Sequence, residues 1–127
     1  MSSETLHESP DVLSDETKNL HRGIVSLREE LEAVDWYQQR AEGCTDEELR
    51  AVLTHNKNEE IEHAMMTLEW LRRKHPVFSA NIDTYLKTTG PITGVEAQAK
   101  GQGGASEGPG EPSASPSLGI GSLKGAR

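Results

Sequence analysis

The side chains best suited to chemistry in this chain are those of Glu60 and His63, which are spaced three residues apart. They interrupt a stripe that recurs every three or four residues, as one face of a helix does, and whose two ends are apolar. Burying an unpaired carboxylate is costly, so the patch faces either water or a group that stabilises it. The spacing lets one helix offer an oxygen and a nitrogen to a single metal ion. A solvated charged face is the plain alternative.

Further acidic residues lie earlier in the chain. Glu30 borders another apolar stripe, with Tyr37 seven residues along on the same side, whereas Glu29, Glu32 and Trp36 share a different face. Three carboxylates within four residues repel one another, and a nearby cation would relieve that repulsion. We interpret Glu30 as a metal ligand and Tyr37 as a hydrogen-bond partner for a ligand carboxylate. A solvated acidic patch and ordinary aromatic packing are the alternatives.

A second cluster lies on the flank of the later stripe. His55, Glu59 and Glu62 follow one another at i, i+4 and i+7, which places them on a common side of a helix. A wet polar face is one interpretation of this trio, and a second, weaker metal site is the other.

Two long helices are predicted to position these groups. The first is expected over about 15–42, because a near-heptad line of aliphatic residues follows Ser14, a suitable N-cap. The second is expected over about 46–74, with Thr45 and Glu48 forming a capping box at its start. Since only a few residues separate them, the two helices should form an antiparallel hairpin.

The remaining segments differ sharply in composition. Residues 1–13 predict a flexible arm, and a short helix over about 77–87 completes a helical domain of residues 14–91. Residues 92–116 are rich in Gly, Ser, Pro and Ala and predict a disordered linker. Residues 117–127 contain an apolar island that suits a peptide docking into another protein's groove. The aliphatic residues of this island are Leu118, Ile120 and Leu123.

Composition limits the classes of function. The 127 residues carry a formal net charge of −8, which argues against binding to nucleic acid or to an anionic membrane surface. No apolar run approaches the ~20 residues of a membrane span. With a single cysteine, Cys44, the chain has no disulfide framework, so a reducing compartment is expected. Only roughly 75 residues can pack, which is marginal for a core, so we expect oligomerisation.

The ligands of a carboxylate-bridged di-iron bundle come from four helices, two giving one Glu each and two giving Glu-x-x-His. This chain has one helix of each kind, with Glu30 on the first and Glu60 and His63 on the second, which is half of such a site. A twofold axis would supply the other half, because it places equivalent surfaces face to face. Mixed oxygen and nitrogen ligands suit iron, and open positions would admit dioxygen. The predicted fold is all-α: a hairpin plus a short helix, completing a four-helix bundle only on dimerisation.

Several segments together resemble the encapsulated ferritins, which are ferritin-like cargo proteins of encapsulin nanocompartments. These segments are residues 29–37, 59–64 and 67–71 and the tail 118–123. The resemblance covers about residues 13–91 plus the tail. It implies a ferritin-like bundle whose ferroxidase centre lies at the dimer interface, and a ring of five such dimers, a decamer.

The resemblance also implies outer metal sites and a location. The entrance site comprises Glu29, Glu32 and Trp36, and the accessory site comprises His55, Glu59 and Glu62. Iron is the metal expected at the centre, and calcium is a further candidate for the outer sites. The tail would bind the encapsulin shell protein, which places the protein in the cytoplasm of a bacterium or archaeon, inside an encapsulin nanocompartment.

We therefore predict a ferroxidase that oxidises Fe(II) to Fe(III) with dioxygen and delivers iron for storage inside the shell. The competing hypothesis is a non-enzymatic, acidic helical adaptor whose carboxylates bind metal structurally and whose tail recruits a partner. Oxygen consumption after addition of Fe(II) distinguishes the two, because an adaptor would consume none.

Overall fold

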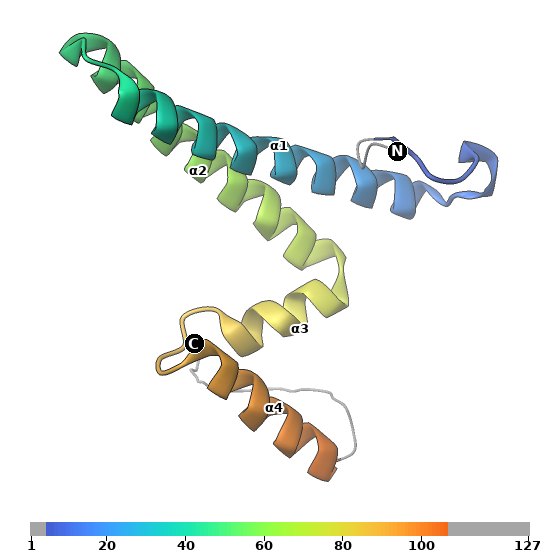
Figure 1. Ribbon diagram of the computed structural model, residues 1–127. Coiled ribbons are helices and arrows are strands. Elements are labelled where there is room, and N and C mark those ends of the chain that lie inside the picture. Colours follow the sequence, from blue (N-terminus) through green and yellow to red (C-terminus); the bar gives the residue numbers. More distant parts are fainter. Residues whose placement is uncertain (1–4, 107–127) are drawn as a thin grey trace. The chain divides into compact units, whose positions relative to one another are not determined.

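The structure, a computed structural model, describes residues 5–106, and all the regular secondary structure in that range is helical (Figure 1). A short 3-10 helix, η1, precedes four α-helices. In chain order the elements are η1 (Pro10–Val12), α1 (Asp15–Gly43), α2 (Glu47–Lys74), α3 (Pro76–Tyr85) and α4 (Ile92–Ser106). The chain divides into two compact units, the first ending at Lys74 and the second beginning at His75. The all-α fold class is confirmed, whereas completion of a bundle by a second copy stays a prediction.

Helix α1 begins where its local signals indicate. The Ser14 hydroxyl accepts a hydrogen bond from the backbone N–H of Thr17 at 3.0 Å, which satisfies one of the free amides of the first turn. Asp15 and Glu16 add negative charge at the positive end of the helix dipole. At the other end, Arg50 Nε donates to the carbonyl of Ala41 at 3.1 Å, so a side chain of α2 closes the last turn of α1.

The start of α2 differs from the prediction. Oδ1 of Asp46, rather than the hydroxyl of Thr45, accepts the hydrogen bond of the first turn, from the backbone N–H of Leu49 at 2.8 Å. The predicted capping box of Thr45 and Glu48 is therefore wrong, because the helix begins at Glu47 and Asp46 occupies the N-cap position. An aspartate is at least as good an N-cap as a threonine, so the local energetics favour this start.

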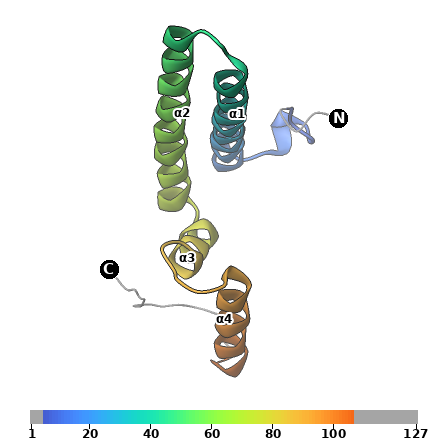
Figure 2. The ribbon, with the colours of Figure 1, turned by 60° about the vertical axis from the view of Figure 1, so that its left-hand side comes forward.

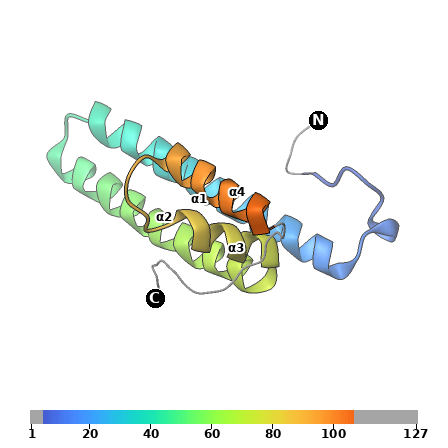
Figure 3. The ribbon, with the colours of Figure 1, turned by 90° about the horizontal axis from the view of Figure 1, so that it is seen from below.

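Helices α1 and α2 form the predicted antiparallel hairpin, lying side by side in both Figure 2 and Figure 3. Two contacts join facing positions. A Cβ atom built on Gly23 would lie only 3.0 Å from Cζ3 of Trp70, so the absent side chain of Gly23 lets the indole approach α1. Further along, Nζ of Lys57 donates to Oε1 of Gln38 at 2.9 Å. These two contacts show which positions of α1 and α2 face each other.

The hairpin leaves much of its apolar surface uncovered. Among the described residues, the buried hydrophobic side chains are those of Ala41, Ala64 and Leu71. Large aliphatic and sulfur-containing side chains are at least two-fifths exposed along both helices. They are Ile24, Leu31, Leu49, Val52, Ile61, Met65 and Met66. So small a core is marginal for a single chain, as the length of the packable segment predicted.

Helix α3 starts at a proline and stops at a strained residue. Pro76 occupies the first turn, where its missing N–H is not needed, and the imidazole of His75 accepts from the backbone N–H of Phe78. The helix was expected to reach about residue 87. It ends at Tyr85 instead, because the backbone of Leu86 is extended, with φ of −78° and ψ of 143°, and Lys87 then takes a left-handed conformation with φ of 64°.

No helix in the described part of the chain is long and apolar enough to cross a membrane.

Helix α4 contradicts the expectation that residues 92–116 form a disordered linker, because residues Ile92–Ser106 are helical. The physical reason lies in its middle, where alanine, glutamine, glutamate and lysine are all good helix formers. Glu96 and Lys100 also form an i, i+4 ion pair at 3.3 Å. Apart from Gly94 in the first turn, the glycines of this stretch begin only at Gly101. The rest of the predicted linker, and the tail of residues 117–127, lie outside the described residues.

Candidate metal centre

Glu60 and His63 lie together on α2. Oε1 of Glu60 is 3.5 Å from Nδ1 of His63, and the two side chains are 27% and 44% exposed. Neighbouring donor atoms around an octahedral ion with bonds of about 2.1 Å lie about 3 Å apart. The pair therefore needs only a small adjustment to bind one ion through an oxygen and a nitrogen. Its partial exposure leaves a route by which an ion can reach it.

Glu30 presents an unusual carboxylate on α1. Its Oε1 atom is buried and has no hydrogen-bond partner among the described residues. A buried carboxylate oxygen without a partner is costly, and an ion that is absent from the single chain is one of the recognised explanations. Glu30 therefore fits the predicted role of metal ligand better than that of a solvated acidic residue.

The register of the hairpin brings Glu30 level with the pair on α2. Glu30 lies seven residues after Gly23 on α1, and His63 lies seven residues before Trp70 on α2. Gly23 and Trp70 face each other, and both helices rise by about 1.5 Å per residue. Glu30 and His63 are therefore at matching heights on antiparallel helices, as the prediction of one shared site requires.

A single chain does not close this site. Within residues 5–106, no three His, Cys, Asp or Glu side chains lie close enough together to hold a metal ion. The chain brings Glu60 and His63 within reach of one ion and places Glu30 at the same height, but does not bring all three together. Further ligands would have to come from another copy or from solvent.

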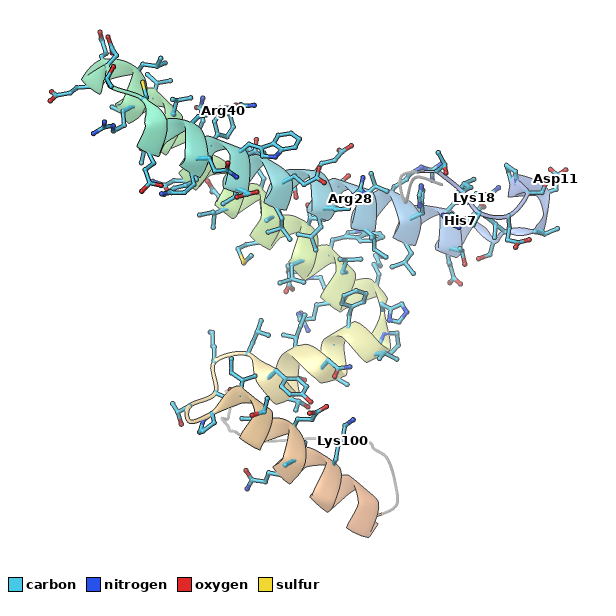
Figure 4. All side chains as sticks on the ribbon, in the orientation of Figure 1. His7, Asp11, Lys18, Arg28, Arg40 and Lys100 are labelled. Atoms are coloured by element: carbon cyan, nitrogen blue, oxygen red, sulfur yellow. The ribbon has the colours of Figure 1, made fainter. Side chains whose placement is uncertain are left out.

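The predicted entrance residues lie on the outer side of the hairpin. Glu29, Glu32 and Trp36 are all exposed, with Trp36 51% accessible. They fall in the stretch of α1 between Arg28 and Arg40 (Figure 4), and their exposure is compatible with a role in attracting cations. No contact tests that role, so the entrance site remains a prediction.

Tyr37 is half-buried and has a cationic neighbour. The guanidinium carbon of Arg40 lies 5.6 Å from the centre of the Tyr37 ring, within the range of a cation–π contact. This contact fixes the side of α1 on which the ring lies. The predicted hydrogen bond from Tyr37 to a ligand carboxylate stays a prediction.

The accessory trio is only partly assembled. Nε2 of His55 lies 3.9 Å from Oε2 of Glu59, and their side chains are 70% and 48% exposed. Glu62 is also exposed on this flank. Such exposure weakens any electrostatic attraction within the trio. A solvent-exposed polar surface therefore accounts for the geometry as well as a weak metal site does.

Sequence reasoning missed the residues that align the two helices. Gly23 carries a signal that could have been used, since a glycine inside a helical pattern often marks a close approach of another element. The hydrogen bond between Lys57 and Gln38 carries none, because neither helix alone reveals which residues of the other it will face. The pairing follows only from the assembled hairpin.

One carboxylate near the end of α2 has a strongly shifted pKa. Hydrogen bonds from Arg72 and then Arg73 lower the pKa of Glu69 from 4.5 to about 2. The distances from Glu69 to the Nε atoms of these arginines are 2.8 and 2.7 Å. This cluster therefore stabilises the C-terminal turns of α2, where positive charge is already favoured by the helix dipole.

The sequence is similar to a known family and to several known proteins. The EncFtn-like family matches residues 5–89. The encapsulated ferritin-like protein of Rhodospirillum rubrum is 54% identical over 127 residues, which cover 98% of this chain and 91% of that protein. The ferritin-like protein of Thermotoga maritima is 45% identical over 95 residues, or 75% of this chain and 83% of the relative.

A more distant relative and a solved structure agree with these matches. The encapsulin nanocompartment cargo protein EncC of Myxococcus xanthus is 27% identical over 79% of this chain and 80% of its own length. The crystal structure of protein ne0167 from Nitrosomonas europaea has a TM-score of 0.67 and 55% identity, covering 68% of this chain and 96% of that one. The resemblance inferred from the motifs is confirmed: the chain belongs to the EncFtn-like family, that of the encapsulated ferritin-like proteins.

Proposed function

We propose that this protein is a ferroxidase that oxidises Fe(II) to Fe(III) with dioxygen, at a di-iron site formed between two copies of the chain. The observation that carries the proposal is the buried, unpartnered Oε1 of Glu30 at the height of the Glu60–His63 pair. Membership of a ferritin-like family supports the same class of chemistry.

Two copies related by a twofold axis would complete the ligand set. Each copy contributes Glu30, Glu60 and His63, so two irons receive six protein groups and retain open positions for dioxygen. Glu30, the ligand that each copy would contribute from α1, is our candidate for a carboxylate shared by the two irons. The two ferrous ions would give up one electron each, and dioxygen that accepts these two electrons together with two protons from water would become hydrogen peroxide. The uncovered aliphatic side chains of the hairpin supply apolar surface for the association.

The outer carboxylates would supply the centre with cations. Glu29 and Glu32, beside Trp36, attract iron toward the interface, and the flank of His55, Glu59 and Glu62 holds further ions. Calcium is a second candidate at both places, because exposed carboxylate oxygens suit a hard cation. We further propose that five dimers form a ring.

The tail would connect the enzyme to its container. The relatives from Rhodospirillum rubrum and Myxococcus xanthus are named as encapsulated and as nanocompartment cargo. For this chain we propose that residues 117–127 bind the encapsulin shell protein through Leu118, Ile120 and Leu123, so that ferric iron is stored inside the shell. Deleting residues 117–127 should spare iron oxidation and abolish loading into co-expressed shells. Retained loading would remove the tail from the proposal.

The ligand assignment is tested by Glu30→Gln, which keeps the shape of the side chain and removes its charge. We expect the rates of ferric iron formation, followed by absorbance, and of oxygen uptake to fall by at least ~10–100-fold. That is the loss typical when a residue that only supports a metal ligand is replaced. Glu42→Gln, an exposed glutamate near the end of α1, is the matched control. Oxidation by Glu30→Gln at the parental rate would refute the assignment.

A non-enzymatic, acidic metal-binding adaptor is the second candidate, and the exposure of the His55–Glu59 pair favours it. Anaerobic addition of Fe(II) followed by air separates the two. An adaptor binds the ion without oxygen uptake, whereas the ferroxidase consumes oxygen and produces ferric absorbance in the same interval.

A further inference from the structure

Lys57 lies close to the candidate centre without contacting its carboxylates. It precedes Glu60 by three residues on α2, a spacing at which the side chains of a helix are neighbours. The half-buried Lys57 donates instead across the hairpin, with Nζ 2.9 Å from Oε1 of Gln38. The ion pair recorded for Glu60 is with His63. The ammonium group of Lys57, which could pair with the Glu60 carboxylate, is therefore bonded to Gln38 on α1 instead.

This arrangement matters because an ammonium group and a metal ion compete for the same carboxylate oxygens. Glu60 is the only acidic residue three or four positions from Lys57 on its own helix. On α1, the acidic residues one turn from Gln38 are Asp35 and Glu42, and Oδ1 of Asp35 already accepts from Nε2 of Gln39 at 3.0 Å. Once released from Gln38, the ammonium of Lys57 has Glu60 as its nearest strong acceptor along α2.

We infer that Gln38 is a positioning residue: by accepting the hydrogen bond of Lys57, it keeps the ammonium group off Glu60 and leaves that carboxylate for a divalent cation. The inference rests on the proposed role of Glu60 as an iron ligand. It adds a function for two side chains outside the ligand set. A neutral acceptor suits this task, because it binds the ammonium without adding another negative charge beside the centre.

The alternative is that the bond between Lys57 and Gln38 only fastens α1 to α2, and the two roles predict different mutant patterns. If the hydrogen bond only holds α1 to α2, Gln38→Met and Lys57→Met lose it equally, and the double variant performs no better than either. In the positioning role, Gln38→Met frees a competing cation, Lys57→Met removes it, and the double variant recovers. Methionine is used at both sites because it keeps side-chain length and helix propensity.

The experiment measures the Fe(II) concentration that gives half the maximal oxidation rate, using the full-length protein. We expect Gln38→Met to raise it about two- to fivefold, as competition from a partly exposed ion pair would, with the maximal rate unchanged. Lys57→Met and the double variant should stay within error of the parent. Gln39→Met, an equivalent change at a residue that bonds only within α1, is the control. An equal rise of this Fe(II) concentration in Gln38→Met, Lys57→Met and the double variant would overturn the inference. It would mean that the hydrogen bond only holds α1 to α2.

A crystal structure of metal-free Gln38→Met gives a second readout that does not depend on iron chemistry. Nζ of Lys57 should move to within 4 Å of the Glu60 carboxylate. An ammonium group that turns to Asp35, to Glu42 or into solvent would contradict the inference even if the protein oxidises iron. Conversely, a move to Glu60 in a protein that oxidises no iron would leave the positioning intact and refute only the proposed function.

Discussion

Glu30 on α1 and His63 on α2 lie at the same height of the hairpin, each seven residues from the close contact between Gly23 and Trp70. This relationship joins two motifs that are more than thirty residues apart in the sequence. It arises from helix–helix register rather than from either motif alone. It is the arrangement that the proposed metal centre between two hairpins requires.

The role of His63 can be separated from that of the other histidine on α2. We expect His63→Gln to weaken Co(II) binding by at least ~10–100-fold, because it removes the nitrogen ligand that each chain would contribute to the proposed centre. His55→Gln changes the same chemical group on the exposed flank and should leave the high-affinity binding unchanged. Titration under nitrogen, followed by the visible absorbance of Co(II), measures both. Equal effects of the two substitutions would place the centre on the flank instead.

Metal should control self-association. The proposed dimer would bring two copies of each acidic cluster together, and cations bound between them would relieve the repulsion. Chelation should therefore shift the protein toward the monomer, and added Fe(II) under nitrogen should restore the dimer or a larger ring. Sedimentation velocity measures the change, with Glu30→Gln expected to depend less on metal. A dimer of equal stability with and without chelator would speak against an interfacial centre.

The parts of the fold that were predictable are those with local causes. The Ser14 cap and the acidic first turn indicate the start of α1 because each acts within a few residues. The closeness of Glu60 and His63 was also predictable, since residues three apart on a helix are neighbours. The predicted cap of α2 was wrong by one residue, because Thr45 and Asp46 are both good caps and local pattern alone does not choose between them.

The parts that were not predictable depend on which residues face one another. The pairing of Lys57 with Gln38 follows from the register of two long helices, which side-chain packing decides. Helix α4 was missed for a different reason: a composition averaged over residues 92–116 hid the helix-forming run around Glu96 and Lys100. Short windows would have separated that run from the glycine-rich part that follows.

The observed cap of α2 makes a direct prediction about stability. Asp46→Ala should lower the free energy of unfolding by about 1 kcal/mol, because it leaves the Leu49 amide without its acceptor. Thr45→Ala should change it by less than about 0.5 kcal/mol, as expected for a surface position without such a role. Urea unfolding of the metal-free protein, followed by circular dichroism, measures both. The reverse order would restore the capping box first inferred from the sequence.

The cluster at the end of α2 predicts a pH dependence. Because the arginine hydrogen bonds lower the pKa of Glu69 from 4.5 to about 2, the folded state binds a proton there less readily than the unfolded state does. The contribution of this carboxylate to stability is therefore complete above pH 4.5 and is lost as the pH falls toward 2. Thermal unfolding of the parent and of Glu69→Gln should differ at pH 7, and the difference should shrink by pH 2.5. Glu42→Gln controls for the loss of one negative charge. A difference that stays constant over this range would mean that Arg72 and Arg73 stabilise the helix end without using the charge of Glu69.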